Sequence, residues 1–193
     1  MDKKKIKETN DKVPDLGKNL AKVAPLDLNL ADPKPKIEGL RLNMGCGTEI
    51  KKGFLNVDKY YAKADAQWDI LDIPLNDDSV AQVMCYEVLE HIPMKQIEKA
   101  LSECYRILKP NGTIVLTVPD IISYCKNVVN DPDNEYNITR IYGNQSHQGQ
   151  FHFNGFTPKT LFRLLGNAGF RTIGVAYFDS SPGVVNIFCE AQK

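Results

Sequence analysis

The sequence predicts a doubly wound α/β domain whose sheet has about seven strands, most of them parallel. From Leu40 onward, short apolar runs alternate with amphipathic helical segments, and turns containing Gly or Asp follow several of the runs. Alternation of this kind is typical of a parallel sheet covered by helices. The last two runs are instead joined by a short turn, which makes them antiparallel. We therefore expect a Rossmann-like sheet that ends in a C-terminal antiparallel hairpin.

The candidate strands differ in the strength of their pattern. The run at residues 113–118 is apolar and β-branched on both faces, as is typical of a buried parallel strand. The run at residues 66–70 is the weakest of the set. The expected strands are residues 40–44, 54–57, 66–70, 80–85, 113–118, 170–178 and 184–191.

Two amphipathic helices are expected beside the sheet. The first begins at Pro93, because a missing amide proton costs little in the first turn of a helix, and apolar residues then recur at helical spacing from Ile97 to Leu108. The second begins at Thr157, which can cap the helix, and Pro158 takes the first helical position.

The chain of 193 residues suits one domain with its own core. Residues 1–36 differ from the rest because they are rich in Lys, Asp, Asn and Pro and contain no aromatic residue. We expect a flexible tail there. The alternative is an ordered lid, since Leu16, Leu20 and Val23 would share one face of a short helix. The folded domain is then residues 37–193.

The composition argues against several classes of partner. A formal net charge of zero disfavours nucleic acid as the main partner. No apolar run is long enough for a membrane span or a signal peptide. The five cysteines form no Cys-x-x-Cys pair, so neither a metal site nor a disulfide framework is expected, and a reducing cytoplasm is the natural compartment.

The sharpest motif joins two strand ends. Gly45, Cys46 and Gly47 follow the first expected strand directly, and two glycines around one small residue let a ligand approach the backbone closely. Asp58 ends the next strand, where a carboxylate can accept both hydroxyls of a ribose. Asp72 follows the third run and could accept from the amine of adenine. Because the carboxyl ends of parallel strands share one edge, the pattern indicates nucleoside binding there.

These motifs, in their order and spacing, resemble the class I S-adenosylmethionine-dependent methyltransferases, in particular the type 11 group. The similarity covers roughly residues 39–192. It rests on Leu-Asn-Met-Gly-Cys-Gly at 42–47, Phe-Leu-Asn-Val-Asp at 54–58, Val-Leu-Glu-His-Ile at 88–92, Ile-Leu-Lys-Pro-Asn-Gly at 107–112 and Phe-Thr-Pro-Lys-Thr-Leu at 156–161.

The resemblance implies S-adenosylmethionine as cofactor and a role for each matching residue. The ribose would bind Asp58, and adenine would lie against Asp72 and Ile73. Glu90 and His91 match the Glu-His pair of the family, with Glu90 counted among the cofactor residues. The residues implied for the methionine part of the donor are Asn43, Gly45, Cys46, Gly47, Cys85 and Tyr86.

The chain also departs from the family. Thr48 and Glu49 stand where many members have Thr-Gly, and Lys59 follows the ribose carboxylate where an apolar residue often covers adenine. Only some ten residues separate Gly47 from Asp58, so the first crossover has room for a helix of one or two turns at most.

The expected function is methyl transfer to a small polar acceptor, such as a sugar or sugar nucleotide. The acceptor region is expected at residues 119–156, because loops after strand ends usually determine specificity. A weakly nucleophilic hydroxyl would need a general base. His91 and His152 are the candidates, and a purely structural role is the alternative for each.

Other functions stay open at this stage. One is a binding protein that keeps this fold without turnover, and another is an aminopropyl transferase. A nicotinamide oxidoreductase is disfavoured by the short first crossover and the terminal hairpin. The chain also lacks the Asn-Pro-Pro-Tyr motif of enzymes that methylate amines of nucleic-acid bases.

Overall fold

The computed structural model describes residues 38–181 and 184–193. The tail or lid expected at residues 1–36 lies outside the described residues, as does the middle of the C-terminal hairpin turn. Within the described ranges, every helix is too short or too polar to cross a membrane.

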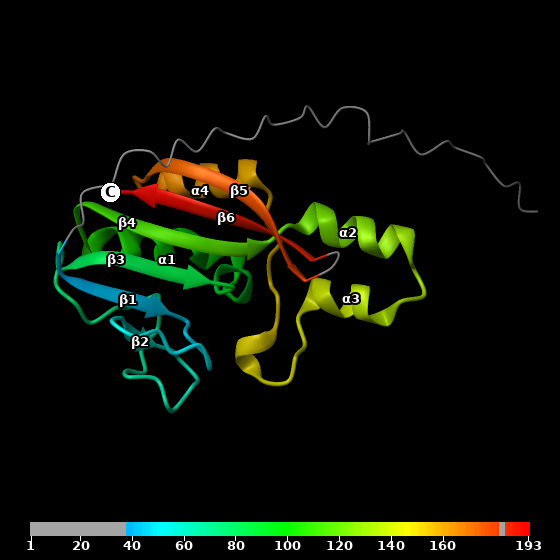
Figure 1. Cartoon of the computed structure of the whole chain (residues 1–193), viewed down its shortest axis with the longest axis horizontal. Coiled ribbons are helices and arrows are strands. Elements are labelled where there is room, and N and C mark those ends of the chain that lie inside the picture. Colours follow the sequence, from blue (N-terminus) through cyan, green and yellow to red (C-terminus); the bar gives the residue numbers. More distant parts are fainter. Residues whose placement is uncertain (1–37, 182–183) are drawn as a thin grey trace, which may run out of the picture.

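The described strands form one sheet in the order β2-β1-β3-β4-β6-β5. β1 to β4 pair in parallel, whereas β6 is antiparallel to both of its neighbours, β4 and β5 (Figure 1). The mostly parallel sheet with its terminal antiparallel hairpin is thus confirmed. The strands are β1 (Leu40–Met44), β2 (Leu55–Val57), β3 (Val80–Tyr86), β4 (Leu108–Pro119), β5 (Arg171–Ser181) and β6 (Val184–Gln192).

The run at residues 66–70 is a loop, so the sheet has six strands rather than about seven. Only single-residue bridges form there, between Val57 and Ala66 and between Asp69 and Asp72. The carboxylate of Asp65 accepts from the backbone and the side chain of Asn56, at 2.8 and 2.9 Å. Side-chain hydrogen bonds to the backbone compete with strand pairing, and in this polar stretch they prevail.

The two expected helices lie side by side on one face of the sheet (Figure 1). They are α1 (Met94–Ile107) and α4 (Pro158–Asn167). The Thr157 hydroxyl caps α4 by accepting from the Thr160 amide at 3.2 Å, as expected. Pro93 is the N-cap of α1 rather than its first residue. The helices bury their apolar stripes against fully buried strand residues such as Val83 and Leu116.

The connection from β1 to β2 contains no helix. The Cys46 amide donates to the Val57 carbonyl at 3.0 Å, and the Gly47 amide donates to the Asp58 carboxylate at 2.8 Å. These two bonds hold the strand ends together directly. The short crossover therefore brings the two sequence motifs into contact.

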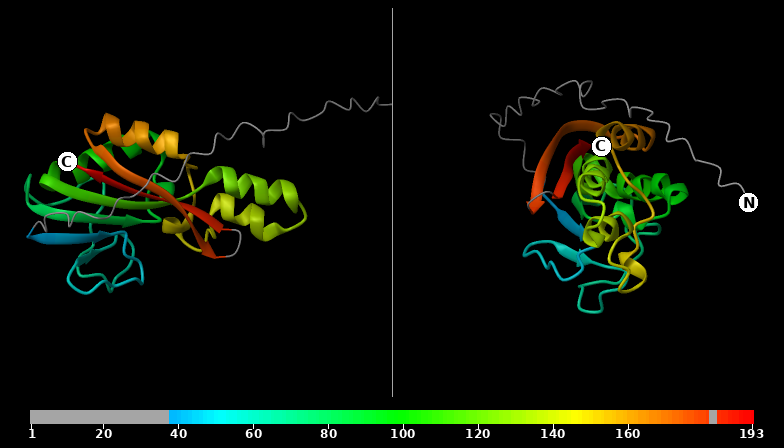
Figure 2. Two further views of the ribbon diagram at one scale, coloured as in Figure 1. Left: turned by 45° about the horizontal axis from the view of Figure 1, so that its top comes forward. Right: turned by 90° about the vertical axis from the view of Figure 1, so that its right-hand side faces the viewer.

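A helix pair that the sequence did not predict follows β4. α2 (Ile121–Asn130) and α3 (Glu135–Tyr142) pack together and project beyond the carboxyl ends of the strands (Figures 1 and 2). The chain then returns through the short helix η2 (Gln148–Gln150) to the turn η1 (Leu89–His91). The Phe153 amide donates to the Glu90 carbonyl at 2.7 Å, which fixes the returning segment beside the end of β3.

Candidate functional site

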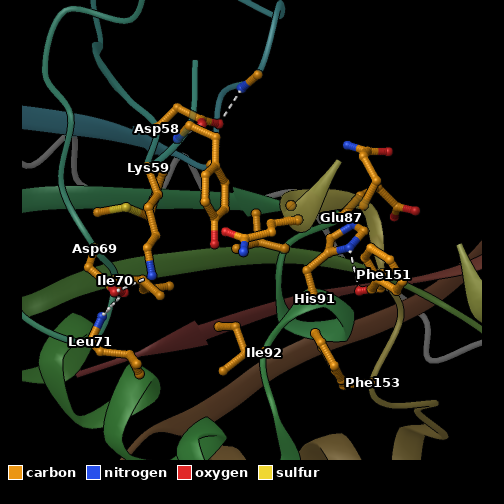
Figure 3. A pocket seen from close by; sticks show the side chains of 18 of the residues that line it. Asp58, Lys59, Asp69, Ile70, Leu71, Glu87, His91, Ile92, Phe151 and Phe153 are labelled. Carbon is orange, nitrogen blue, oxygen red and sulfur yellow. Dashed lines mark hydrogen bonds and ion pairs between the residues drawn. The ribbon is translucent and has the colours of Figure 1, made fainter. Parts of the chain in front are cut away.

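A pocket of about 630 Å³ opens at the carboxyl ends of β1, β2 and β3. Its size falls in the usual range for small-molecule sites, and its place is where open α/β sheets bind ligands. Lys59, Asp69, Ile70 and Leu71 lie on one side of it, and His91, Phe151 and Phe153 lie on the other (Figure 3). The remaining lining residues are Met44, Gly45, Gly47, Asp58, Tyr60, Trp68, Glu87, Val88, Ile92, Pro93, Gln96, Gln148, Gly149 and Gln150.

The two glycines of the first motif have different constraints. Both adopt left-handed backbone conformations, with φ of +69° at Gly45 and +47° at Gly47. A Cβ on Gly45 would collide with the Val88 side chain, whereas a Cβ on Gly47 would meet no atom within 4 Å. Gly45 therefore allows close packing inside the protein, and Gly47 presents bare backbone to open space in the pocket.

Asp58 joins the ends of the first two strands. One carboxylate oxygen accepts from the Gly47 amide at 2.8 Å, and the other accepts from the amides of Tyr60 and Tyr61 at 2.7 and 2.8 Å. A carboxylate offers about four acceptor positions. The oxygen that faces Gly47 therefore keeps one position for a ligand hydroxyl, while the other oxygen is occupied by the protein.

Asp69, Ile70 and Leu71 line the pocket, whereas Asp72 and Ile73, which the resemblance places beside adenine, do not. Ile73 is buried, and its amide donates to the Glu103 carboxylate at 3.0 Å. Asp69 pairs with the Lys59 ammonium at 2.8 Å. Asp72 and Ile73 lie outside the pocket wall because residues 66–70 form a loop. A loop does not place the residues after it at the sheet edge, as a strand would.

Several residues implied for the methionine part lie behind the pocket rather than in its wall: Asn43, Cys46, Cys85 and Tyr86. The amide of Asn43 donates to the Glu49 carbonyl at 2.7 Å and to Asn56 at 3.0 Å, so this side chain braces the loop after β1. Cys85 is fully buried, and burial raises the pKa of its thiol well above the usual value.

A cluster of two carboxylates and two histidines lies beyond the end of β3. Glu87 and His91 line the pocket, while Glu90 and His152 lie behind them. The rings of His91 and His152 meet edge to face, with 4.8 Å between their centroids. Burial, and next the charge of His91, lower the pKa of His152 to about 4. Its sequence neighbours Phe151 and Phe153 are 37% and 56% exposed.

The two carboxylates of this cluster are strongly affected by burial. Glu90 is 1% exposed. Burial raises its pKa well above the usual value, the charge of Glu87 adds to the effect, and only its own backbone amide opposes it. Burial also raises the pKa of Glu87. Glu87 has a φ of +53°, unusual for a residue other than glycine. The sequence did not point to Glu87, because packing rather than a local sequence pattern imposes its left-handed conformation.

The expected acceptor region contributes to the pocket through residues 148–151 and 153. Its helix η2 meets the segment that follows Asp58, because a Cβ on Gly149 would lie 2.7 Å from the Tyr60 ring. His147 lies 6.2 Å from that same ring, centroid to centroid. Tyr142 and His147 are exposed and do not line the pocket.

Several solved structures with the same fold are methyltransferases. A SAM-dependent methyltransferase from Archaeoglobus fulgidus superposes with a TM-score of 0.58 at 20% identity, over 82% of this chain and 87% of that one. The 1,6-didemethyltoxoflavin-N1-methyltransferase of Burkholderia thailandensis, bound to 1,6-didemethyltoxoflavin and S-adenosylhomocysteine, gives 0.57 at 13% identity, over 80% and 70% of the chains. At these identities the likeness establishes the fold.

Sequence comparison points to the same group of enzymes. Residues 41–116 match the profile of the type 11 methyltransferase domain. This match bears out the resemblance to class I S-adenosylmethionine-dependent methyltransferases. A probable S-adenosylmethionine-dependent methyltransferase from Mycolicibacterium smegmatis is 24% identical over 149 residues, which are 76% of this chain and 49% of that protein. The chain thus spans about half the length of this curated relative.

The residues of the methyltransferase domain fit its cofactor, S-adenosylmethionine. Gly47 offers bare backbone in front of open space, and Asp58 beside it keeps one acceptor position for a hydroxyl. The apolar side chains of Ile70 and Leu71 lie on one side of the pocket, where a flat base can pack (Figure 3). The comparisons confirm S-adenosylmethionine as the expected cofactor.

Proposed function

We propose that this domain transfers the methyl group of S-adenosylmethionine to a hydroxyl of a small polar acceptor, in the class of sugars and sugar nucleotides. One observation carries the proposal: a single pocket joins the strand ends at Gly47 and Asp58 to the segment at residues 148–153. Donor and acceptor would therefore meet in one enclosed space, as transfer requires.

The donor side is assigned to the first half of the chain. The turn from Gly45 to Gly47 would hold the methionine part, one oxygen of Asp58 would accept from the ribose, and Ile70 with Leu71 would cover adenine. When bound, the cofactor supplies a methyl group that its positive sulfur already activates. The work left to the protein is alignment of the acceptor and exclusion of water.

The acceptor side is assigned to the opposite wall. Gln96, Gln148 and Gln150 offer amide groups that can bind hydroxyls, and Phe151 and Phe153 offer rings that can cover carbon-bound hydrogens. Amide and aromatic groups of this kind suit a sugar-like molecule better than an apolar one. This division supports residues 119–156 as an acceptor-binding insertion in a methyltransferase domain of residues 37–193.

The transfer step itself requires one proton acceptor. The acceptor oxygen forms a bond to the methyl carbon, the carbon–sulfur bond breaks, and its electron pair stays on sulfur. The hydroxyl proton must leave to a neighbouring group. Glu87 and His91 line this end of the pocket and are the candidates, whereas His152 lies behind His91 and would position it.

The proposal extends to the cellular setting. All five cysteines are free, which fits a reducing cytoplasm. Nucleic acid is not the proposed acceptor, since the chain has no net positive charge.

Calorimetry and a transfer assay test the proposal together. The full chain should bind S-adenosylmethionine and S-adenosylhomocysteine but not NAD, and methyl-tritiated donor should label a sugar or sugar nucleotide in a screen of polar metabolites. Donor binding without label in any acceptor would favour a non-catalytic binding protein. Turnover with the decarboxylated donor and a polyamine would favour an aminopropyl transferase. Binding of NAD alone would refute the donor assignment.

A further inference from the structure

One cluster of potential metal ligands lies at the acceptor end of the pocket. Glu90, His91 and His152 each offer one ligand atom, and these atoms all lie within 4.8 Å of one another. Folding brings the cluster together, because Glu90 and His91 belong to η1 while His152 follows η2. The cysteine pattern predicted no metal site, but none of these three ligands is a cysteine.

Glu90 is the least expected member of the cluster. Its side chain is 1% exposed, and neither carboxylate oxygen has a hydrogen-bond partner of acceptable geometry among the described residues. A buried carboxylate without a partner is costly unless it is protonated or paired with a cation. None of the described salt bridges involves Glu90. A bound cation would satisfy both oxygens.

His91 is already oriented as a ligand. Nδ1 of His91 lies 3.0 Å from the Phe151 carbonyl oxygen. Because a carbonyl can only accept, Nδ1 must donate, and Nε2 keeps its lone pair. Metal-binding histidines typically donate their second ring nitrogen to a carbonyl in this way, which fixes the ring and its tautomer.

We propose that Glu90, His91 and His152 bind one divalent transition-metal cation of the zinc type. Two imidazoles and one carboxylate are a ligand set that such cations prefer. With bonds of about 2.0–2.1 Å, tetrahedral ligand atoms lie roughly 3.4 Å apart. The distances between the three ligand atoms would therefore have to shorten by at most roughly 1.5 Å for them to coordinate one cation. Three protein ligands leave a further position open, as in catalytic rather than structural sites.

The cation would face the acceptor. His91 lines the pocket on the side of Phe151 and Phe153, so an acceptor hydroxyl could take the open position (Figure 3). A bound cation lowers the pKa of an oxygen ligand and so favours loss of its proton. With His91 engaged by the metal, Glu87 is the group left to receive that proton. This role rests on the proposed function, whereas metal binding itself does not.

Metal binding is tested on tag-free full-length protein that has been stripped with a chelator. We expect Zn²⁺ to bind with one ion per chain in calorimetry, and Co²⁺ to give visible absorption typical of low coordination. Glu90→Gln and His152→Ala should each weaken Zn²⁺ binding by more than roughly 10–100-fold. That range is typical when the changed residue only hydrogen-bonds to a metal ligand. His147→Ala is the matched control, because His147 is exposed and outside the cluster.

A second variant separates a ligand from a structural residue. Because the Glu90 carboxylate has no partner, Glu90→Leu should leave the melting temperature of the metal-free protein unchanged or raise it, and should abolish the rise in melting temperature that Zn²⁺ causes in the parent protein. The proposal is overturned if the parent protein binds no ion, or if Glu90→Gln and His152→Ala bind as tightly as His147→Ala.

The same samples keep the two proposals apart. Binding of S-adenosylhomocysteine to the stripped protein reports on the donor site without any metal. Methyl transfer at full rate by stripped protein in the presence of chelator would overturn the role of the metal and leave the proposed function standing. One-to-one Zn²⁺ binding that depends on Glu90 and His152 would support the metal site even if no acceptor were found.

Discussion

Asp58 has a structural role and a proposed binding role, because one carboxylate serves three protein amides and still keeps one acceptor position. We expect Asp58→Ala to lose a charge-assisted bond to the ribose worth about 1.5–3 kcal/mol. Donor affinity should then fall by roughly ten- to a hundred-fold in calorimetry. The free energy of unfolding should also fall by about 1–3 kcal/mol, because the amides of Gly47, Tyr60 and Tyr61 lose their acceptor.

Asp58→Asn is the control for this pair of effects, since it keeps one oxygen in place and should fall between the parent and Asp58→Ala in both measurements. Unchanged donor affinity in Asp58→Ala would place the ribose elsewhere.

The two glycines of the first motif make a matched pair of substitutions. Gly45→Ala should lower the free energy of unfolding by about 2–4 kcal/mol, because the new methyl group meets Val88 and the backbone is left-handed. Gly47→Ala carries only the backbone cost of about 1 kcal/mol, since the space beside it is open. That space is where the donor is expected, so Gly47→Ala should nevertheless weaken donor binding. Equal stability of the two variants in urea unfolding would contradict this assignment.

At the scale of elements, the C-terminal half of α1 holds the loop that we propose borders adenine. The Arg106 guanidinium donates to the carbonyls of Ile73 and Leu75 at 2.8 and 2.7 Å and to the Glu103 carboxylate. We expect Arg106→Ala to lower the free energy of unfolding by about 1–3 kcal/mol and to weaken donor binding through the loop. Arg163→Ala, at an exposed position of α4, is the control and should change neither quantity.

This contact also predicts a pH dependence. The hydrogen bond from Arg106 lowers the pKa of Glu103 below its usual value. A group whose pKa is lowered by folding stabilises the protein above its unfolded pKa of about 4.3, and this stabilisation is lost as the pH falls through the folded value. The stability difference between the parent and Arg106→Ala should therefore be largest near neutral pH and shrink below about pH 4. A constant difference in unfolding experiments across this range would contradict the role of Glu103.

The sequence predicted the elements whose signals are local. The Thr157 cap of α4 and the apolar run in β4 need only neighbouring residues, and the structure confirms both. The run at residues 66–70 failed because its fate depends on Asp65 meeting Asn56, a contact that no local pattern reveals. α3 was missed for another reason: its eight residues are fewer than the window over which an apolar stripe can be recognised, and none of them is buried.

The same distinction applies to the site. Gly45, Gly47 and Asp58 could be placed in the pocket from sequence because each lies within three residues of a strand end. Asp72 and Ile73 follow the run at residues 66–70, which forms no strand, and they do not line the pocket. The left-handed conformation of Glu87 and the meeting of Glu90 with His152 arise from packing between distant segments, so only the structure reveals them.

At the scale of the whole molecule, the two halves of the chain supply opposite walls of one pocket. Lys59, Asp69 and Leu71 come from the segment before β3, whereas Phe151 and Phe153 come from the segment after α3 (Figure 3). The helix pair α2 and α3 makes this possible, because it carries the chain out beyond the strand ends and back (Figure 2). Donor and acceptor binding should therefore be separable by mutation.

Phe153→Ala tests this separation. The ring is 56% exposed and lines the acceptor wall, so its loss should cost little stability and leave the affinity for S-adenosylhomocysteine unchanged within about twofold. The KM for the acceptor should rise by about tenfold, since a ring that covers the acceptor is worth on the order of 1–2 kcal/mol. Phe162→Ala on α4 is the matched control, because that ring is 38% exposed and outside the pocket. If Phe153→Ala instead weakened donor binding while the KM for the acceptor stayed constant, the two walls would have to exchange their assignments.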